Sequence, residues 1–317
     1  MAFDVAIIGA GIIGSCTAYR LAARGMRVLW VGDGREGSTV AAAGMLSPSY
    51  EHAHEAGAPP FQKMLDEGLR AWERFAREVS GDPQTDLGYR LSGVYGIGFH
   101  ARPPGSVLPE ADALPSFTRK PAVFMPREGM VEPLRVLAFL RSEFARLGGV
   151  FAEGTASLAE GGIAVDGAFH AAGTVVLTTG ARPELAPEGL QPVRGQAFLV
   201  RLAGEDRGAV PTVVRSSTAY FVPRLDGTVY IGATEEWPGA IAQTADELWR
   251  DAERLLPCLG RAEILRRLEG FRPFVSRLGP LIARDKERAD LVRAQGHHRN
   301  GILLAPLTAE AVEDLVV

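Results

Sequence analysis

The sequence predicts a mixed α/β fold whose parts are interleaved along the chain. Two observations predict it: the N-terminal segment alternates strand-like and helix-like patterns, and later segments resemble antiparallel strands joined by tight turns. A third observation is that no linker-like tract divides the 317 residues into separate units. A chain of this length can bury one large core or two medium ones.

The N-terminal unit is expected to be a β-α-β segment. Phe3–Ile8 is short, apolar and followed by glycine, as is typical of a buried parallel strand. A helix over residues 11–24 and a second strand over 27–31 are expected to follow. Between the first strand and the helix lies Gly9-Ala10-Gly11-Ile12-Ile13-Gly14.

This glycine spacing predicts a Rossmann-like dinucleotide site. Gly9 permits a tight turn, Gly11 lets the backbone approach a pyrophosphate, and Gly14 lets the helix pack closely on the sheet. An acidic residue that binds a ribose hydroxyl is expected at the end of the second strand. That position is Gly32, so Asp33 is the candidate, and a simple turn aspartate is the alternative. The loop alone does not separate FAD from NAD(P).

Further helices and strands are expected along the rest of the chain. Asp226-Gly227 predicts a hairpin turn, and Thr244 with Glu247 predicts a capping box at a helix start. Helices are expected over 60–79, 133–147, 244–256 and 307–317, a small β-meander over 155–170, and strands over 174–178, 195–202, 220–224 and 228–231.

Composition argues against several classes of protein. A net charge of −4 and a pI near 5.9 disfavour a nucleic-acid binder. No apolar stretch reaches membrane-spanning length, and the chain begins without a basic signal segment. With only Cys16 and Cys258, a reducing cytoplasm is the simplest location. His52 and His54 lie in a stretch expected to be a polar loop, and no metal site is expected.

Three segments favour a flavin over a nicotinamide. Residues 38–46 are mostly small and would let a planar ring lie against backbone, although an Ala-rich helix start is the alternative. Residues 175–180 form an apolar strand that ends at Thr179-Gly180, and a plain core strand is the alternative. Residues 296–306 form a Gly-rich turn before a helix, where a helix N-terminus stabilises negative charge. A simple loop is the alternative there.

With these motifs in place, the chain resembles the FAD-dependent D-amino-acid oxidase superfamily, and within it the bacterial glycine oxidases. The matching segments occur in family order and cover nearly the whole chain: 9–14, 41–46, 192–196, 220–224, 232–234, 271–273 and 298–306.

The resemblance implies a discontinuous FAD domain, over 1–80, 130–190 and 270–317. It also implies a substrate domain built on an antiparallel sheet, over 81–129 and 191–269. FAD is expected to be bound non-covalently, since no cysteine follows Cys258. The cofactor-binding residues are then Gly9, Gly11, Ile12, Ile13, Gly14, Asp33, Thr39, Ala42, Ala43, Gly44, Met45, Thr179, Gly180, His298, Arg299, Asn300, Gly301, Ile302 and Leu303.

The resemblance also implies the reaction and its residues. Glycine or a small D-amino acid is oxidised to an imino acid, which hydrolyses to a keto acid and ammonia, while O2 is reduced to H2O2. Arg272 and Tyr220 are expected to bind the substrate carboxylate, and Arg299 to face the substrate or the flavin. Met45 and Glu235 are candidate specificity residues, because a carboxylate at position 235 would favour substrates with basic side chains.

Other functions remain open at this stage. A D-amino-acid dehydrogenase or a sarcosine-type amine oxidase would use another electron acceptor or secondary amines. An NAD(P)-dependent dehydrogenase would explain the phosphate loop but not the C-terminal Gly-rich block. A non-enzymatic flavin-binding subunit is disfavoured by Arg272 and Tyr220 together. The expected partners are a small amino acid, an electron acceptor and further copies of the chain in a homo-oligomer, without nucleic acid.

Overall fold

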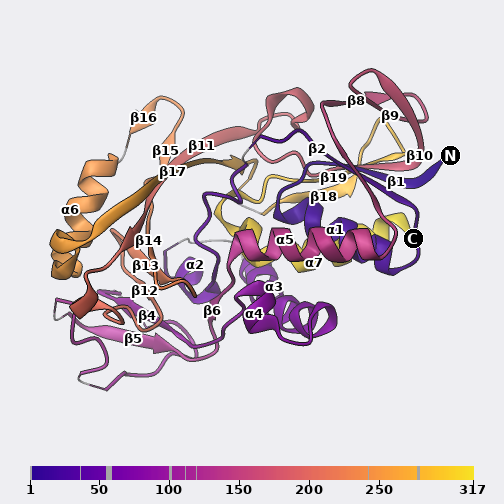
Figure 1. Ribbon diagram of the computed structural model, residues 1–317. Helices are drawn as coiled ribbons and strands as arrows, with labels where there is room; N and C mark the ends of the chain where they lie inside the picture. Colours follow the sequence, from indigo (N-terminus) through magenta and orange to yellow (C-terminus); the bar gives the residue numbers. More distant parts are fainter. Residues whose placement is uncertain are drawn as a thin grey trace.

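The computed structural model describes residues 2–35, 37–54, 59–99, 102–110, 112–118, 120–241, 243–276 and 279–317. Two large sheets form the two halves of the molecule (Figure 1). One is mostly parallel and carries both chain termini on its side; the other is mostly antiparallel. The predicted mixed α/β fold class is confirmed.

The parallel-rich sheet has the strand order β18-β19-β10-β1-β2-β7. Its strands run parallel except for β18, and the strands β8 and β9 extend it as a meander. The short strand expected over 174–178 is the end of the longer β10, which also forms the last strand of the meander. The bounds are β1 Phe3–Ile8, β2 Val28–Gly32, β7 Val150–Glu153, β8 Ala156–Ala159, β9 Gly162–Val165, β10 Ala168–Leu177, β18 Leu281–Arg284 and β19 Leu291–Gln295.

Helices cover one face of this sheet. Successive strand residues point to opposite faces, so Val5 and Ile7 pack with the helices, whereas Ala6 and Ile8 pack beneath the meander. The helices are α1 Ile12–Ala23, α5 Pro133–Arg146 and α7 Gly301–Val316, and α3 Pro59–Val79 packs on α7. Buried Glu313 of α7 pairs with Arg20 of α1 and with Arg24 directly after it, and so holds the two helices together.

The antiparallel-rich sheet has the order β16-β15-β11-β14-β13-β12-β4-β5, and β17 pairs with β11 along its whole length. Helix α6, Ala245–Leu255, packs on one face and begins with the expected capping box. Strand β17, Glu263–Phe274, was not expected from the sequence. The other bounds are β4 Val94–Ile97, β5 Ala122–Met125, β11 Gln191–Arg201, β12 Val213–Arg215, β13 Tyr220–Pro223, β14 Val229–Gly232, β15 Glu236–Trp237 and β16 Ala240–Ile241.

Short elements join the two halves. Strand β3, Met45–Leu46, pairs with β6, Gly129–Met130, and α2, Pro48–His54, follows it. The backbone of residues 52–54 is therefore helical, so the expectation of a loop there is wrong. Residues 38–46 form a turn and an extended segment rather than the Ala-rich helix start considered as an alternative. Helix α4 spans Pro83–Leu87.

The final helix begins at Gly301, earlier than the expected start at residue 307, and contains Pro306. Proline has no N–H and leaves the carbonyl four residues earlier without its helical donor. That carbonyl belongs to Ile302, and it accepts a hydrogen bond of 2.7 Å from the indole Nε1 of Trp72 on α3. A tertiary donor therefore takes the place of the missing N–H, which allows the helix to continue through the proline.

The division into two domains stays a prediction. Strands of the parallel-rich sheet come from residues 3–32, 150–177 and 281–295, and strands of the other sheet from 94–125 and 191–274. The expected boundary between residues 269 and 270 falls inside β17.

Candidate functional site

A cavity of about 720 Å³ lies where the two sheets meet, and it is lined by residues from both halves of the chain. Its volume falls in the usual range for small-molecule and cofactor sites. The walls come from the phosphate loop, residues 37–51, the β12–β13 segment, the end of β17 and the start of α7.

The phosphate loop has the close contacts that its glycines predict. Gly9 adopts a φ of 121°, and a Cβ there would lie 2.4 Å from the Thr178 carbonyl oxygen. A Cβ on Gly14 would lie 2.0 Å from the Gly9 carbonyl oxygen. Helix α1 has no acidic residue in its first turn. Its positive N-terminal end is thus left available to a phosphate.

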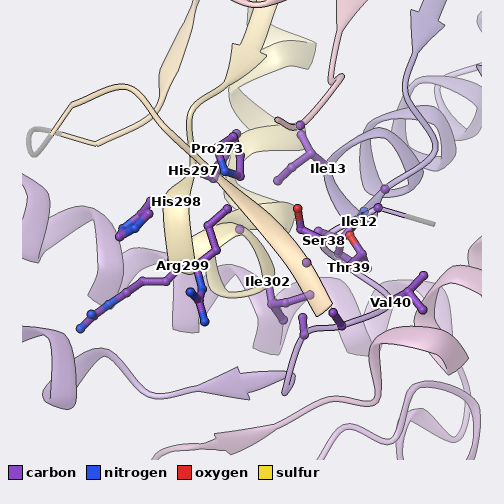
Figure 2. Close-up of a pocket in the computed structure, with 18 of the residues that line it drawn as sticks. Ile12, Ile13, Ser38, Thr39, Val40, Pro273, His297, His298, Arg299 and Ile302 are labelled. Atoms are coloured by element: carbon purple, nitrogen blue, oxygen red, sulfur yellow. Dashed lines mark hydrogen bonds between the residues drawn. The ribbon is translucent and has the colours of Figure 1, made fainter. Parts of the chain in front are cut away.

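The segment after β2 folds back over this loop. The backbone N–H of Ile12 donates a 3.0 Å hydrogen bond to Oγ1 of Thr39 (Figure 2). Gly44 has a φ of 85°, and a Cβ there would lie 2.1 Å from the Val131 carbonyl oxygen. The small side chains of this segment let its backbone pack closely against the phosphate loop and Val131 along the cavity wall.

The missing acid at the end of β2 has a steric cause. A Cβ on Gly32 would lie 2.6 Å from Cβ of Ala10 and 3.0 Å from the Phe151 ring, so a side chain does not fit. Asp33 lines the cavity, but its carboxylate accepts a 2.6 Å hydrogen bond from Nε of Arg35 and pairs with Arg182. Asp33 is thus already engaged by two arginines.

The start of α7 forms another wall of the cavity. His298 has a φ of 49°, which is unusual for a residue with a side chain, and its buried Nε2 has no hydrogen-bond partner within the described part of the chain. Burial lowers the pKa of His298 to about 4, so its ring is neutral at pH 7. His297 is buried against Thr308, with 2.9 Å between Nε2 and Oγ1, and burial lowers its pKa to about 3.

Arg272 and Tyr220 lie over glycines on neighbouring strands. A Cβ on Gly195 of β11 would lie 2.5 Å from the Arg272 guanidinium, and one on Gly232 of β14 would lie 2.2 Å from the Tyr220 ring. Nη1 of Arg272 donates to the Thr234 carbonyl oxygen at 3.0 Å. The two glycines therefore make room for both side chains above the sheet, and both side chains line the cavity.

Arg299 lies between two carboxylates at the same end of the cavity. Its Nε donates to Glu51 at 2.6 Å, and its Nη1 lies 3.3 Å from Oε2 of Glu235. Nε1 of Trp237 donates to the other oxygen of Glu235 at 3.0 Å. Burial would raise the pKa of Glu235, but the charges of Arg299 and Arg272 and the hydrogen bond from Trp237 outweigh it and hold the pKa below its usual value.

Sequence reasoning missed Glu51, Tyr50 and Arg215. Arg215 is buried on β12, with its guanidinium 3.4 Å from the centre of the Tyr50 ring and 3.6 Å from Glu51. Its Nε has no hydrogen-bond partner among the described residues. Each is a single residue outside any motif, and no signal in the sequence separates them from the many other charged and aromatic residues.

The structure brings the predicted site residues together. All of them line the one cavity except Gly14, which packs behind the phosphate loop. Figure 2 shows Ile12, Thr39 and Ile302 near one another, with His298 and Arg299 toward the other end. Their individual roles stay predictions. Among the described residues, no cluster of three or more His, Cys, Asp or Glu side chains is placed to hold a metal ion.

Comparison with known proteins identifies the class. The family of FAD dependent oxidoreductases matches residues 4–315, so the chain belongs to this family, and FAD is its cofactor. Three features fit such a dinucleotide: the glycines of the phosphate loop, the N-terminus of α1 without an acidic residue in its first turn, and the size of the cavity. No described helix is long and apolar enough to cross a membrane.

Particular relatives point to one branch of the family. The chain is 29% identical to a glycine oxidase of Geobacillus kaustophilus, over 99% of this chain and 93% of that protein. The crystal structure of glycine oxidase from Geobacillus kaustophilus superposes with a TM-score of 0.84 at 27% identity, covering 99% and 94% of the two chains. A bifunctional protein ThiO/ThiG of Synechocystis is 31% identical, over 99% of this chain but 51% of that protein. The chain thus spans about half the length of the bifunctional relative.

Proposed function

We propose that this protein uses non-covalently bound FAD to oxidise glycine or small D-amino acids to the imino acid, with O2 reduced to H2O2. The imino acid then hydrolyses to a keto acid and ammonia. Membership of the FAD dependent oxidoreductase family and likeness to glycine oxidases support the proposal.

One observation carries the choice of substrate. Arg215, Arg272 and Arg299 all line the cavity. Arg215 and Arg299 both lie beside Glu51, whereas Arg272 makes no ion pair with any described carboxylate. Arg272 instead donates to backbone carbonyl groups at 3.0 and 3.5 Å. A substrate carboxylate would neutralise its charge, and a guanidinium fixes the plane of a carboxylate by two parallel hydrogen bonds.

The chain's own residues bind and orient the reactants. The phosphate loop and the N-terminus of α1 would hold the pyrophosphate, and the segment 39–45 would face the flavin. Bound FAD supplies a hydride acceptor. The N-terminus of α7, which has no acidic residue in its first turn, favours negative charge beside it. Arg272 and Tyr220 hold the substrate so that its Cα–H faces the cofactor.

Met45 and Glu235 are proposed to set the size and charge of the substrate side-chain pocket, because both line the cavity. We further infer a cytoplasmic protein that forms homo-oligomers. The location is supported by Cys16 and Cys258, which are both free and buried.

The test combines colour, activity and one substitution. We expect the purified protein to be yellow and to release H2O2 with glycine or small D-amino acids. Arg272→Met should lower kcat/KM about 100-fold or more, which corresponds to losing charge-assisted hydrogen bonds worth about 3 kcal/mol. The control is Arg266→Met, since Arg266 is exposed on the same strand and outside the cavity.

Three outcomes would contradict the proposal. Reduction of an artificial dye without peroxide would indicate a dehydrogenase. Turnover of secondary amines alone would indicate a sarcosine-type oxidase. Unchanged kinetics of Arg272→Met would remove the residue from the substrate site.

A further inference from the structure

We propose that Glu153, on strand β7, binds the adenosine ribose of FAD in place of the acidic residue that is missing at Gly32. The inference concerns the cofactor and holds whichever substrate is oxidised. In dinucleotide-binding folds the ribose hydroxyl is bound by an acid at the end of the second strand, a position that here carries no side chain.

Position 32 has no room for a side chain larger than that of glycine. Its Cβ would lie 2.6 Å from Cβ of Ala10 in the phosphate loop and 3.0 Å from Cζ of Phe151. The Ala10 methyl is fixed to the backbone, and the Phe151 ring packs edge-on against Trp30 with centroids 5.0 Å apart. The space that a β2 acid would need is therefore filled by protein.

Asp33 is held by charges from two directions. Nε of Arg35 donates to its Oδ2 at 2.6 Å, and Arg182 pairs with the same carboxylate from the segment after β10. Its side chain is largely buried, at 16% exposure. A ribose hydroxyl at Asp33 would therefore compete with charge-assisted hydrogen bonds, which are the stronger kind in proteins.

Glu153 is placed one strand away, on the correct face. Strands β2 and β7 pair in parallel, with Gly32 opposite Glu153. Paired residues on neighbouring strands point to the same face, about 4.8 Å apart. The carboxylate leans back toward β2, since Oε1 of Glu153 lies 2.7 Å from the place where a Cβ of Gly34 would stand. Gly34, with a φ of 72°, leaves that space open.

Glu153 also has the charge and access that the role requires. It lines the cavity and is exposed, and its carboxylate makes no hydrogen bond or ion pair with another described residue. Arg141 of α5 lies near enough for their charges to interact, and it lines the same cavity. The Glu153 carboxylate is thus available to accept hydrogen bonds from two ribose hydroxyls.

The test measures binding to the apoprotein rather than activity. FAD and FMN are titrated by flavin fluorescence into wild type and Glu153→Gln, with Glu160→Gln, an exposed change in the β8–β9 turn, as control. We expect Glu153→Gln to raise the Kd of FAD about 10- to 100-fold. The Kd of FMN, which lacks adenosine, should change less than about twofold by the same reasoning.

A second pair of ligands tests the contact with the ribose 2′-hydroxyl. Calorimetric titration should show that wild type prefers ADP to 2′-deoxy-ADP and that Glu153→Gln binds the two equally. An unchanged FAD Kd in Glu153→Gln, equal weakening of FAD and FMN, or persistence of the ADP preference would each overturn the proposal. If Asp33→Asn weakens the binding of FAD but not of FMN, and Glu153→Gln does not, then Asp33 and not Glu153 binds the ribose. A negative result in the amino-acid panel leaves these measurements intact, because they need no substrate.

Discussion

Replacing Trp72 by Phe tests how the start of α7 is held beside the cofactor cavity. The indole Nε1 of Trp72 donates a 2.7 Å hydrogen bond to the Ile302 carbonyl, whose helical donor is lost because residue 306 is proline. Both Trp72 and Ile302 are buried. Removing the donor leaves a buried carbonyl without a partner, which costs about 1–3 kcal/mol, in addition to lost packing.

The hydrogen-bond part can be separated from the packing part. In a Pro306→Ala background, the backbone N–H that alanine brings to position 306 can donate to the Ile302 carbonyl as in an ordinary helix. Trp72→Phe should then cost only the packing term. The double-mutant cycle of Trp72→Phe and Pro306→Ala should therefore give a coupling free energy of about 1–2 kcal/mol.

The assay is urea unfolding of the four proteins as apoproteins, followed by far-ultraviolet circular dichroism. Apoprotein is used because bound FAD adds its own stabilisation to the folded state. Trp249→Phe is the control, since Trp249 packs against Phe198 in the core of the antiparallel-rich sheet, a cluster separate from the one that contains Trp72 and α7. If Trp72→Phe costs the same in both backgrounds, within about 0.5 kcal/mol, the account of Pro306 is wrong.

Two further predictions concern His297 and Glu235. Burial lowers the pKa of His297 to about 3 in the folded protein, against 6.5 when exposed. The contribution of neutral His297 to the free energy of unfolding is therefore fully present above pH 6.5 and is lost as pH falls toward 3, by about 1.4 kcal/mol per pH unit. Between pH 7.5 and 4.5 the Tm of His297→Gln should fall less steeply than that of wild type, and equal slopes would refute this. For Glu235, we expect Glu235→Met to lower the activity ratio of D-Arg or D-Lys to glycine in a peroxide assay, and an unchanged ratio would exclude selection of basic side chains.

Features that depend on a few consecutive residues could be predicted from the sequence. The phosphate loop, the capping box at Thr244 and the start of α5 at Pro133 each follow from local backbone requirements, and each lies where expected. The cofactor class came from motifs near both ends of the chain through family resemblance. The start of α7 was misplaced because the partner of the Ile302 carbonyl comes from a distant helix.

Strand β17 shows why other elements were missed. Its residues are mostly exposed or half-buried, and charged side chains such as Arg266, Arg267 and Glu269 interrupt any apolar alternation. The strand exists because it pairs with β11, from Gln191↔Phe274 to Arg201↔Glu263. Such long-range pairing leaves little periodic signal in the sequence. Glu51 and Arg215 were missed for the same reason, since only the folded chain brings them together.

The arrangement of charge at the Tyr220 end of the cavity supports a substrate with a single carboxylate. Among the side chains that line this end of the cavity, the guanidinium groups of Arg215, Arg272 and Arg299 outnumber the carboxylates of Glu51 and Glu235 by one. Glu128, which does not line the cavity, adds its charge interaction to Arg215 and not to Arg272. Arg272 carries this excess, because the other two arginines lie beside Glu51. Low-dielectric surroundings make an unmatched charge costly, so a bound carboxylate gains both contact and neutrality. A second carboxylate on the substrate would reverse the imbalance, whereas glycine or a small amino acid bound with its amine uncharged removes it.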